Sequence, residues 1–372
     1  MKLLRVKASH FKNCCDDFTI DLTPKSRKTE EDKEYELQEI APNLHVFNTA
    51  AFIGKNASGK TTAIELLDCA YSILGDFRLE DKHYDYDGVE LEITFFHDGF
   101  LYRYETELVS ENSMGNQACF RNEHIYRKEF FKTYAKEIYA PDGYEELTNL
   151  GNLPEDTSNI FFILNKKKTR AVFLDSYSGG ADTYQLLFRA LKNYDLDPDV
   201  LPKIIRIFDE TIKELTRIDD HNYRVVTENG ERILSDTKLI YFLSSGTTKG
   251  ILLYTLMAAS LKEGFDLLID EVENHFHKTL VDNMISLYKD KSVNRNNATL
   301  IFTTHYCEVL DQIGRQDNIW ICNADSHIHL TNMYEDYQIR PVLLKSKQYY
   351  SNAFRTAVNY EDLMALKKVL KK

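Results

Sequence analysis

The sequence predicts an α/β protein built on a parallel sheet, with an N-terminal antiparallel β subdomain and a mainly helical insertion. Residues 46–53 form an apolar run that enters a glycine-containing loop, and residues 61–74 then place apolar side chains on one helical face. Residues 89–106 alternate apolar and polar side chains with a period of two, which is typical of a β-hairpin. From residue 246 onward, helix and strand patterns alternate, as they do in parallel α/β sheets.

The other elements follow from the same periodicities. Two short strands are expected at residues 4–8 and 18–22, and the charged segment 23–43 is expected to form a surface loop or a short helix. His97, Asp98 and Gly99 supply the turn of the hairpin. The remaining expected elements are helices at 182–193, 201–216, 247–262 and 277–288, strands at 265–269, 299–303, 319–322 and 327–330, a second hairpin at 222–234, and a helical tail after residue 349.

Composition limits the class of protein. The chain has 372 residues, 43% of them hydrophobic, so it can form a sizeable core over two or three units. Its six cysteines show neither a disulfide framework nor zinc-site spacing. The N-terminus lacks a signal-peptide core, and no stretch approaches the roughly 18 apolar residues of a membrane-spanning helix. We therefore expect a cytoplasmic protein without membrane contact.

The charge balance bears on nucleic-acid binding. The formal net charge is −12, which argues against DNA bound over the whole surface because the long-range field repels phosphate. Local basic patches remain, and residues 166–170 are the most concentrated one. Such a run is more often a solvated surface than a DNA contact.

The glycine-containing loop matches the phosphate-binding pattern G-x-x-x-x-G-K-[ST]. Its glycines let the backbone curl so that N–H groups point at phosphate oxygens, while Lys60 reaches the terminal phosphates and the Thr61 hydroxyl binds Mg²⁺. The apolar strand before it and the amphipathic helix after it are the context that this motif requires. The residues expected to hold ATP here are Gly54, Lys55, Asn56, Ala57, Ser58, Gly59, Lys60, Thr61 and Thr62.

Residues 266–271 form an apolar strand that ends in two carboxylates. Asp270 suits a Mg²⁺ contact, and Glu271 suits a general base that polarises the attacking water. Acidic residues often end strands, so this motif has weight because a phosphate-binding loop precedes it. Thr303, Thr304 and His305 end the next strand, where the His305 imidazole is a candidate catalytic group that contacts the γ-phosphate or holds the water.

Two further patterns are weaker. Ser244, Ser245 and Gly246 begin a predicted helix, where hydroxyls and free N–H groups form a second anion site, although a plain helix cap would have the same residues. His275 and His277 are spaced like a metal-binding pair, but we give a dedicated transition-metal site little weight.

Together, the four motifs resemble in order and spacing the ATPase head of the ABC superfamily. The resemblance covers most of residues 1–60, 88–108 and 240–331. The signature, residues 243–247, reads LSSGT where transporters have LSGGQ, and DEVENHFH begins at Asp270. Both features are similar to the SMC, RecF and OLD-like side of the superfamily, particularly the small AAA-type ATPases of bacterial anti-phage defence. The family's glutamine loop is not identifiable, since Gln117 is only roughly placed.

The resemblance implies an ABC-type ATPase head divided into four segments. Residues 1–120 would hold the phosphate-binding loop and the antiparallel hairpin, and residues 121–238 would form the mainly helical insertion. Residues 239–335 would carry the signature, the two carboxylates and the histidine, and residues 336–372 would form a tail.

The resemblance also implies how the head works. Two copies would close around two ATP molecules, with Ser244, Ser245 and Gly246 of one copy against the γ-phosphate held by the other. ATP and Mg²⁺ are the expected cofactors. We expect a sensor or motor subunit of an anti-phage defence system, with any DNA contact confined to local patches. Because no nuclease pattern follows His305, we expect a toxic activity to lie in a separate effector protein or in the middle segment of this chain.

Other functions stay open. An ATPase of DNA repair or maintenance, of the RecF or SMC kind, would have the same motifs. A scaffold that binds nucleotide without hydrolysing it would tolerate loss of Glu271, so the presence of this carboxylate favours turnover. A transporter subunit is disfavoured by the long gap between the hairpin and the signature, and by a signature sequence that reads LSSGT in place of LSGGQ.

Overall fold

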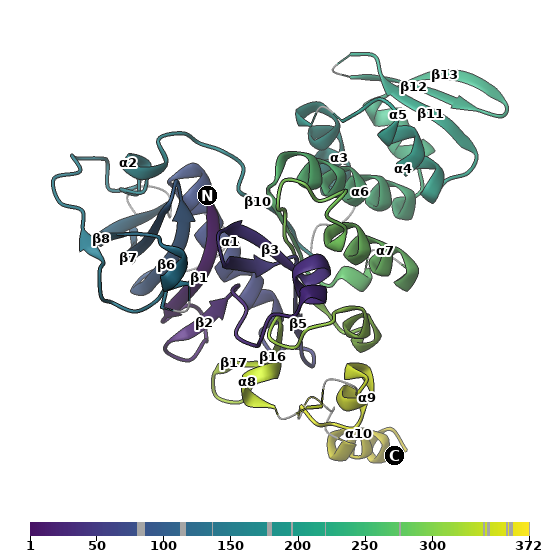
Figure 1. Ribbon diagram of the computed structural model, residues 1–372. Helices are drawn as coiled ribbons and strands as arrows, with labels where there is room; N and C mark the ends of the chain where they lie inside the picture. Colours follow the sequence, from purple (N-terminus) through teal and green to yellow (C-terminus); the bar gives the residue numbers. More distant parts are fainter. Residues whose placement is uncertain are drawn as a thin grey trace.

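The computed structural model describes residues 1–79, 86–111, 117–135, 137–176, 181–194, 196–219, 221–274, 277–337, 339–340, 343–354, 356 and 360–371. At its centre is a six-stranded sheet in which β10, β14, β15, β5 and β16 run parallel and β17 is antiparallel to β16 (Figure 1). In sheet order, the strands are β10 (Ala171–Leu174), β14 (Asp266–Ile269), β15 (Leu300–Thr304), β5 (Thr49–Ile53), β16 (Ile319–Ala324) and β17 (Ile328–Asn332).

Both faces of this sheet are buried. In β5, Phe52 packs into a core shared with the antiparallel sheet and with helix α1 (Lys60–Asp76). Its neighbours Ala51 and Ile53 pack into a second core with α6 (Ser245–Glu263) and α7 (Lys278–Lys289). A strand buried on both faces is apolar throughout, which is why residues 46–53 predicted one. The run is in fact two strands, since β4 (Leu44–Phe47) ends before Asn48.

A second six-stranded sheet is entirely antiparallel and covers α1 (Figure 1). The predicted early strands and the predicted hairpin are confirmed. His97 pairs with Phe100 across the turn, where Asp98 and Gly99 both have positive φ. The strands, in sheet order, are β2 (Phe18–Asp21), β1 (Lys2–Ser9), β6 (Val89–His97), β7 (Phe100–Glu111), β8 (Gln117–Glu129) and β9 (Glu145–Glu146).

The segment 121–238, expected as a mainly helical insertion, contains strands as well as helices. After β10 joins the central sheet, the chain forms a lobe that we call the insertion lobe, residues 181–242 (Figure 1). Its elements are α3 (Ala181–Asn193), α4 (Val200–Phe208), the antiparallel strands β11 (Ile212–Arg217), β12 (Asn222–Thr227) and β13 (Gly230–Ser235), and α5 (Asp236–Phe242); the short helix α2 (Phe161–Leu164) precedes β10.

One prediction in this lobe is wrong. The helix expected at 201–216 ends at Phe208, and β11 begins at Ile212. The Asp209 carboxylate accepts hydrogen bonds from the backbone N–H of Thr211 at 3.0 Å and from its hydroxyl at 2.6 Å. Such local bonds stabilise a turn in place of a helix, and pairing with β12 then stabilises the strand. The hairpin predicted at 222–234 is confirmed as β12 and β13.

The rest of the chain surrounds this core. Residues 23–43 contain the π-helical turn η1 (Asp32–Glu36) and β3 (Leu37–Ala41), which pairs with β4. The other predicted α/β elements are present within a few residues of their expected ends, with 3-10 turns η4 (Val272–Asn274) and η5 (Cys307–Gln312). Past β17 lie α8 (Met333–Asp336), α9 (Lys345–Tyr350) and α10 (Tyr360–Leu370). No helix among the described residues is long and apolar enough to cross a membrane.

A buried polar network joins the two sheets beneath α1. Lys2 Nζ donates to Asp266 Oδ1 at 2.6 Å and to Thr299 Oγ1 at 2.8 Å, and Tyr71 OH donates to Asp266 Oδ2 at 2.6 Å. Burial beside this carboxylate raises the pKa of Tyr71 well above its usual value. Because Asp266 begins β14 and Asp270 follows its last residue, the network fixes the end of the strand opposite the carboxylate motif.

Candidate nucleotide-binding site

The phosphate-binding loop, residues 54–59, joins β5 to the first turn of α1. Ala57 and Gly59 have φ angles of 59° and 92°, in the left-handed region that glycine adopts readily. A Cβ atom at Gly54 would lie 2.5 Å from the Cys322 carbonyl oxygen, so a larger residue does not fit there. The curl of the loop and its two glycines are therefore set by backbone geometry and by contact with β16.

Lys60 is folded back across this loop. Its side chain is buried, and Nζ donates to the carbonyl oxygens of Gly54 at 3.2 Å and Lys55 at 3.1 Å. Burial lowers the pKa of Lys60 below its usual value, and the nearby carboxylates of Asp270 and Glu271 partly oppose that shift. A polyphosphate in the loop would stabilise the charged ammonium further, because an opposite charge favours the ionised form.

The loop fits a phosphate group. The α1 helix begins at Lys60, and the N–H groups of its first turn have no partner within the helix, which favours an anion at this end. The N–H groups of this first turn and the Lys60 ammonium thus lie at the loop where the sequence predicts ATP phosphates.

Asp270 is the centre of the candidate metal site. It is fully buried, and three hydroxyl groups donate to its carboxylate. Thr61 Oγ1 and Ser176 Oγ donate to Oδ2 at 2.9 Å and 2.8 Å, and Thr303 Oγ1 donates to Oδ1 at 2.7 Å. The structure therefore brings together Thr61 and Asp270, the two predicted metal ligands. Carboxylate and hydroxyl oxygens are suitable ligands for Mg²⁺, so the residues present fit this ion.

Glu271 lies beside Asp270 in a strained backbone conformation, with φ of 49°. Its N–H donates to Thr303 Oγ1 at 2.6 Å, and its Oε2 accepts a hydrogen bond from the Asn274 amide. Its Oε1 lies 3.7 Å from His305 Nε2, and both side chains are about one-third exposed. The backbone N–H of His305 donates to Glu273. The two predicted catalytic groups are thus adjacent and accessible to a water molecule.

The signature residues lie apart from this cluster. Ser244 caps α6 by accepting a hydrogen bond from the Thr247 N–H at 3.0 Å, and Ser245 and Gly246 are exposed. Within the described ranges, no hydrogen bond or ion pair joins residues 244–246 to residues 54–62. The plain helix cap is therefore present, and a single copy does not bring its own signature to its own phosphate-binding loop.

The weaker candidates do not join the site. Gln117 begins β8 in the antiparallel sheet, paired with Glu111. His275 lies outside the described residues, and His277 caps α7. In the part of the chain that the structure describes, no group of three or more His, Cys, Asp or Glu side chains could hold a metal ion. The basic run 166–170 directly precedes β10, at the opposite end of the parallel strands from the phosphate-binding loop.

Sequence reasoning missed the roles of Ser176 and Thr303. Thr303 lies in β15, where only the histidine that follows the strand was a candidate from the sequence. A hydroxyl near the end of a parallel strand is itself an indication of a polar site there. Ser176 follows the short apolar strand β10, which the sequence did not identify because residues 171–174 are too few for a clear period. Only the parallel pairing of β10 with β14 places Ser176 next to Asp270.

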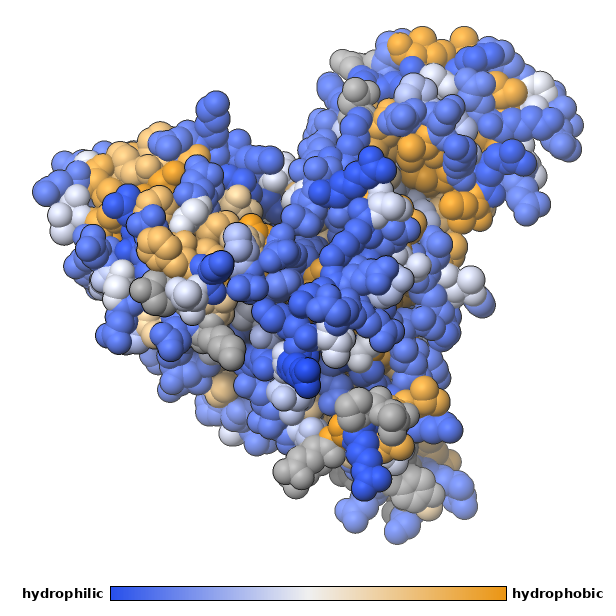
Figure 2. Space-filling model, viewed as in Figure 1, coloured by the Kyte–Doolittle hydropathy of each residue, from blue (hydrophilic) through white to orange (hydrophobic). Residues whose placement is uncertain are grey.

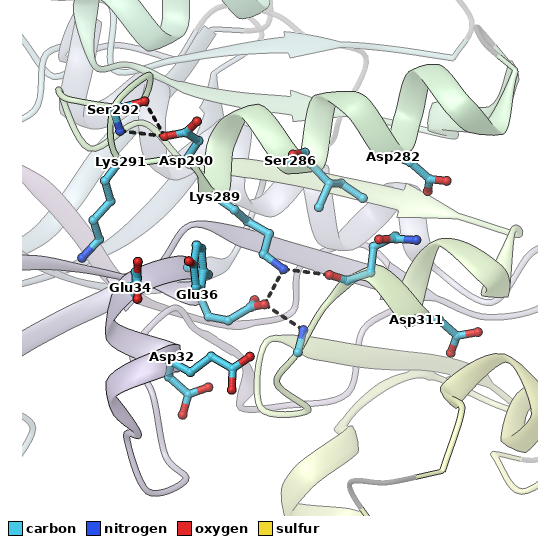
Figure 3. A pocket seen from close by; sticks show the side chains of 15 residues that line it. Asp32, Glu34, Glu36, Asp282, Ser286, Lys289, Asp290, Lys291, Ser292 and Asp311 are labelled. Carbon is cyan, nitrogen blue, oxygen red and sulfur yellow. Dashed lines mark hydrogen bonds and ion pairs between the residues drawn. The ribbon is translucent and has the colours of Figure 1, made fainter.

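A separate hollow is unsuited to phosphate. It has a volume of about 850 Å³ and lies between η1, α7 and η5 (Figure 3). Glu34, Glu36, Asp282, Asp290 and other acidic side chains line it. Its Lys289 is already paired with Glu36 at 2.5 Å and with the Gln312 carbonyl oxygen at 2.8 Å. The acidic lining would repel a nucleotide.

The comparison with protein families identifies the class. Residues 50–311, more than half of the chain, match the family described as "AAA domain, putative AbiEii toxin, Type IV TA system". The matched range includes the phosphate-binding loop, the signature, both carboxylates and His305. The chain therefore belongs to this AAA-domain family, and its fold is that of a nucleotide-binding ATPase. No curated protein matches the sequence significantly.

Solved structures of similar architecture include SMC heads. The SMC head domain from Thermotoga maritima is 11% identical, with a TM-score of 0.43 over 89% of this chain and 99% of that one. An SMC head bound to the C-terminal winged-helix domain of ScpA is also 11% identical, with a TM-score of 0.46 over 89% of this chain and 98% of that one.

Replacing Lys60 with alanine should weaken ATP binding by about tenfold or more. The phosphates lose their main cationic contact, and hydrogen bonds to charged groups contribute about 1.5–3 kcal/mol. Isothermal titration calorimetry of Lys60→Ala measures the loss, with Lys203→Ala on the exposed side of α4 as the matched control. Equal affinities for Lys60→Ala and wild type would show that the loop does not hold the phosphates.

Proposed function

We propose that the protein hydrolyses ATP, that two copies close around two ATP molecules, and that it is the sensor or motor subunit of a bacterial anti-phage defence system. The observation that carries the catalytic part is the intact cluster of Lys60, Thr61, Asp270 and Glu271 at the carboxyl ends of neighbouring parallel strands. A degenerate scaffold would not need a general base in this position.

The residues divide the chemistry of hydrolysis among them. Lys60 and the loop N–H groups hold the β- and γ-phosphates in line for attack. Bound Mg²⁺, held by Thr61 and Asp270, would neutralise charge that develops on the phosphates. Glu271 accepts a proton from the attacking water, and the exposed His305 imidazole next to it orients that water or contacts the γ-phosphate.

The exposure of the signature supports the proposed dimer. Ser244, Ser245 and Gly246 present hydroxyl groups and the N-terminus of the 19-residue helix α6 to solvent. That arrangement suits an anion, but the phosphates of the same copy lie at another helix. A second copy would bring its bound γ-phosphate to this surface, and ATP would thereby hold the two heads together.

The defence role rests on the family and on the resemblance of the signature. The matching family is described as a putative toxin of a type IV toxin–antitoxin system. The insertion lobe offers a surface for a separate effector, because Ile207, Ile218 and Ile233 are more than half exposed and apolar side chains gather on it (Figure 2). A DNA repair or maintenance ATPase is the second candidate, and the exposed Lys166, Lys167 and Lys168 favour it.

The biological role is tested in phage-challenged cells. Cells with the native locus should survive infection, and cells with the Lys60→Ala version should not, although both proteins are expressed to the same level. Equal survival would remove ATP-driven defence as the function and would leave DNA maintenance as the better account.

Replacing Glu271 with glutamine should lower the rate of ATP hydrolysis by about a hundredfold or more while ATP still binds. The amide keeps the size and hydrogen bonding of the side chain but cannot accept the proton. Phosphate release and nucleotide affinity are measured on the same preparation, with Glu228→Gln in the distal hairpin as the control. Turnover within threefold of wild type would exclude Glu271 as the base.

Replacing Ser245 with arginine in the Glu271→Gln background should prevent the ATP-dependent dimer. The bulky cation would stand where the γ-phosphate of the partner docks. Light scattering with ATP and Mg²⁺ should give a dimer mass for Glu271→Gln alone and a monomer mass for the double variant. Thr237→Arg, in the first turn of α5, is the control; identical masses for all three would contradict the shared site.

A further inference from the structure

Ser176 is placed next to the candidate metal site by the central sheet. The strand β10 pairs in parallel with β14, so that Leu174 lies beside Ile269. The N–H of Asp270 donates to the Leu174 carbonyl oxygen at 2.9 Å, which continues the pairing beyond the last strand residue. Ser176 therefore reaches the Asp270 carboxylate from the side opposite β15.

The Ser176 hydroxyl repeats the arrangement of the Thr61 hydroxyl. Each donates its proton to the same atom, Asp270 Oδ2, at 2.8 Å and 2.9 Å. A hydroxyl has one donor proton and two lone pairs, so donation to the carboxylate holds each oxygen in place without using its lone pairs. Thr303 donates to the other carboxylate oxygen and also accepts the Glu271 N–H, so one of its two lone pairs is already in use.

We infer that Ser176 Oγ is a direct ligand of the Mg²⁺ ion that accompanies ATP, alongside Thr61 Oγ1. This inference rests on the proposed function, since it assigns a residue to the same site. Mg²⁺ binds six oxygens in near-octahedral geometry and usually keeps several waters beside a few protein and phosphate oxygens. Two neutral hydroxyls, polarised by one buried carboxylate, supply two of those positions without adding charge to a site that must also accept phosphates.

A merely structural role for Ser176 has a different consequence. If the hydroxyl only held the Asp270 carboxylate, its loss would weaken every divalent cation to the same degree. A direct ligand instead contributes its own chemical softness, so replacing oxygen by sulfur changes which cation is preferred. The preference between a hard and a soft cation therefore separates the two roles.

The test compares Ser176→Ala, Ser176→Cys and wild type by calorimetric titration of ATP with Mg²⁺ or with Cd²⁺. Ser176→Ala should lower the Mg²⁺-supported affinity by about tenfold, the loss expected when a group of a metal site is removed. Ser176→Cys should lose a similar amount with Mg²⁺ but regain most of it with Cd²⁺, which prefers sulfur. Wild type and Ser176→Ala lack the added cysteine, so their titrations with Cd²⁺ measure any effect of Cd²⁺ binding to the six native cysteines.

The outcomes are separable. Mg²⁺-supported affinity of Ser176→Ala within twofold of wild type would overturn the inference, and so would equal Cd²⁺-to-Mg²⁺ ratios for Ser176→Ala and Ser176→Cys. Cooperative thermal unfolding of each variant without nucleotide verifies that it is folded. Lys60→Ala is titrated in parallel: if it binds ATP as wild type does, the proposed function fails, whereas its loss of binding beside an unaffected Ser176→Ala refutes only the assignment of Ser176.

Discussion

One fully buried carboxylate, that of Asp270, holds the site together. A buried charge is costly unless hydrogen bonds compensate it, and here three hydroxyls from three separate elements do so. Thr61 comes from α1, Ser176 from the end of β10 and Thr303 from β15. Since each donor belongs to a different part of the chain, satisfying this one charge fixes the relative positions of the phosphate-binding loop, the central sheet and the segment that leads into the insertion lobe.

The segment that contains Ser176 also lies near the helix α6, which begins in the signature. Asp175, the neighbour of Ser176, lines a small hollow together with Lys249 of α6, the helix that begins at Ser245. The segment that carries Ser176 therefore lies beside the helix that begins at the signature.

Much of the fold was predictable because the local signals agreed with the tertiary structure. The period-two hairpin, the loop before α1 and the helix–strand alternation after residue 246 each have one strong pattern. The prediction of a helix at 201–216 failed because the apolar pattern does not reveal the turn at Asp209, where the chain leaves the helix and begins β11. In the site, Thr61, Asp270, Glu271 and His305 carry motif spacing, whereas Ser176 reaches Asp270 only through long-range strand pairing, which no local window contains.

The left-handed backbone conformation of Glu271 lowers the stability of the fold at the position of the proposed base. An L-residue with a side chain of this size loses about 1–2 kcal/mol in such a conformation, which glycine or asparagine adopts with less strain. Replacing Glu271 with glycine or asparagine would relieve this strain and at the same time remove the proposed base, so a relative with either residue could fold more stably than this chain. If such a relative arose in a population, its persistence would not be limited by protein stability. Retention of glutamate at this position would then report natural selection for turnover.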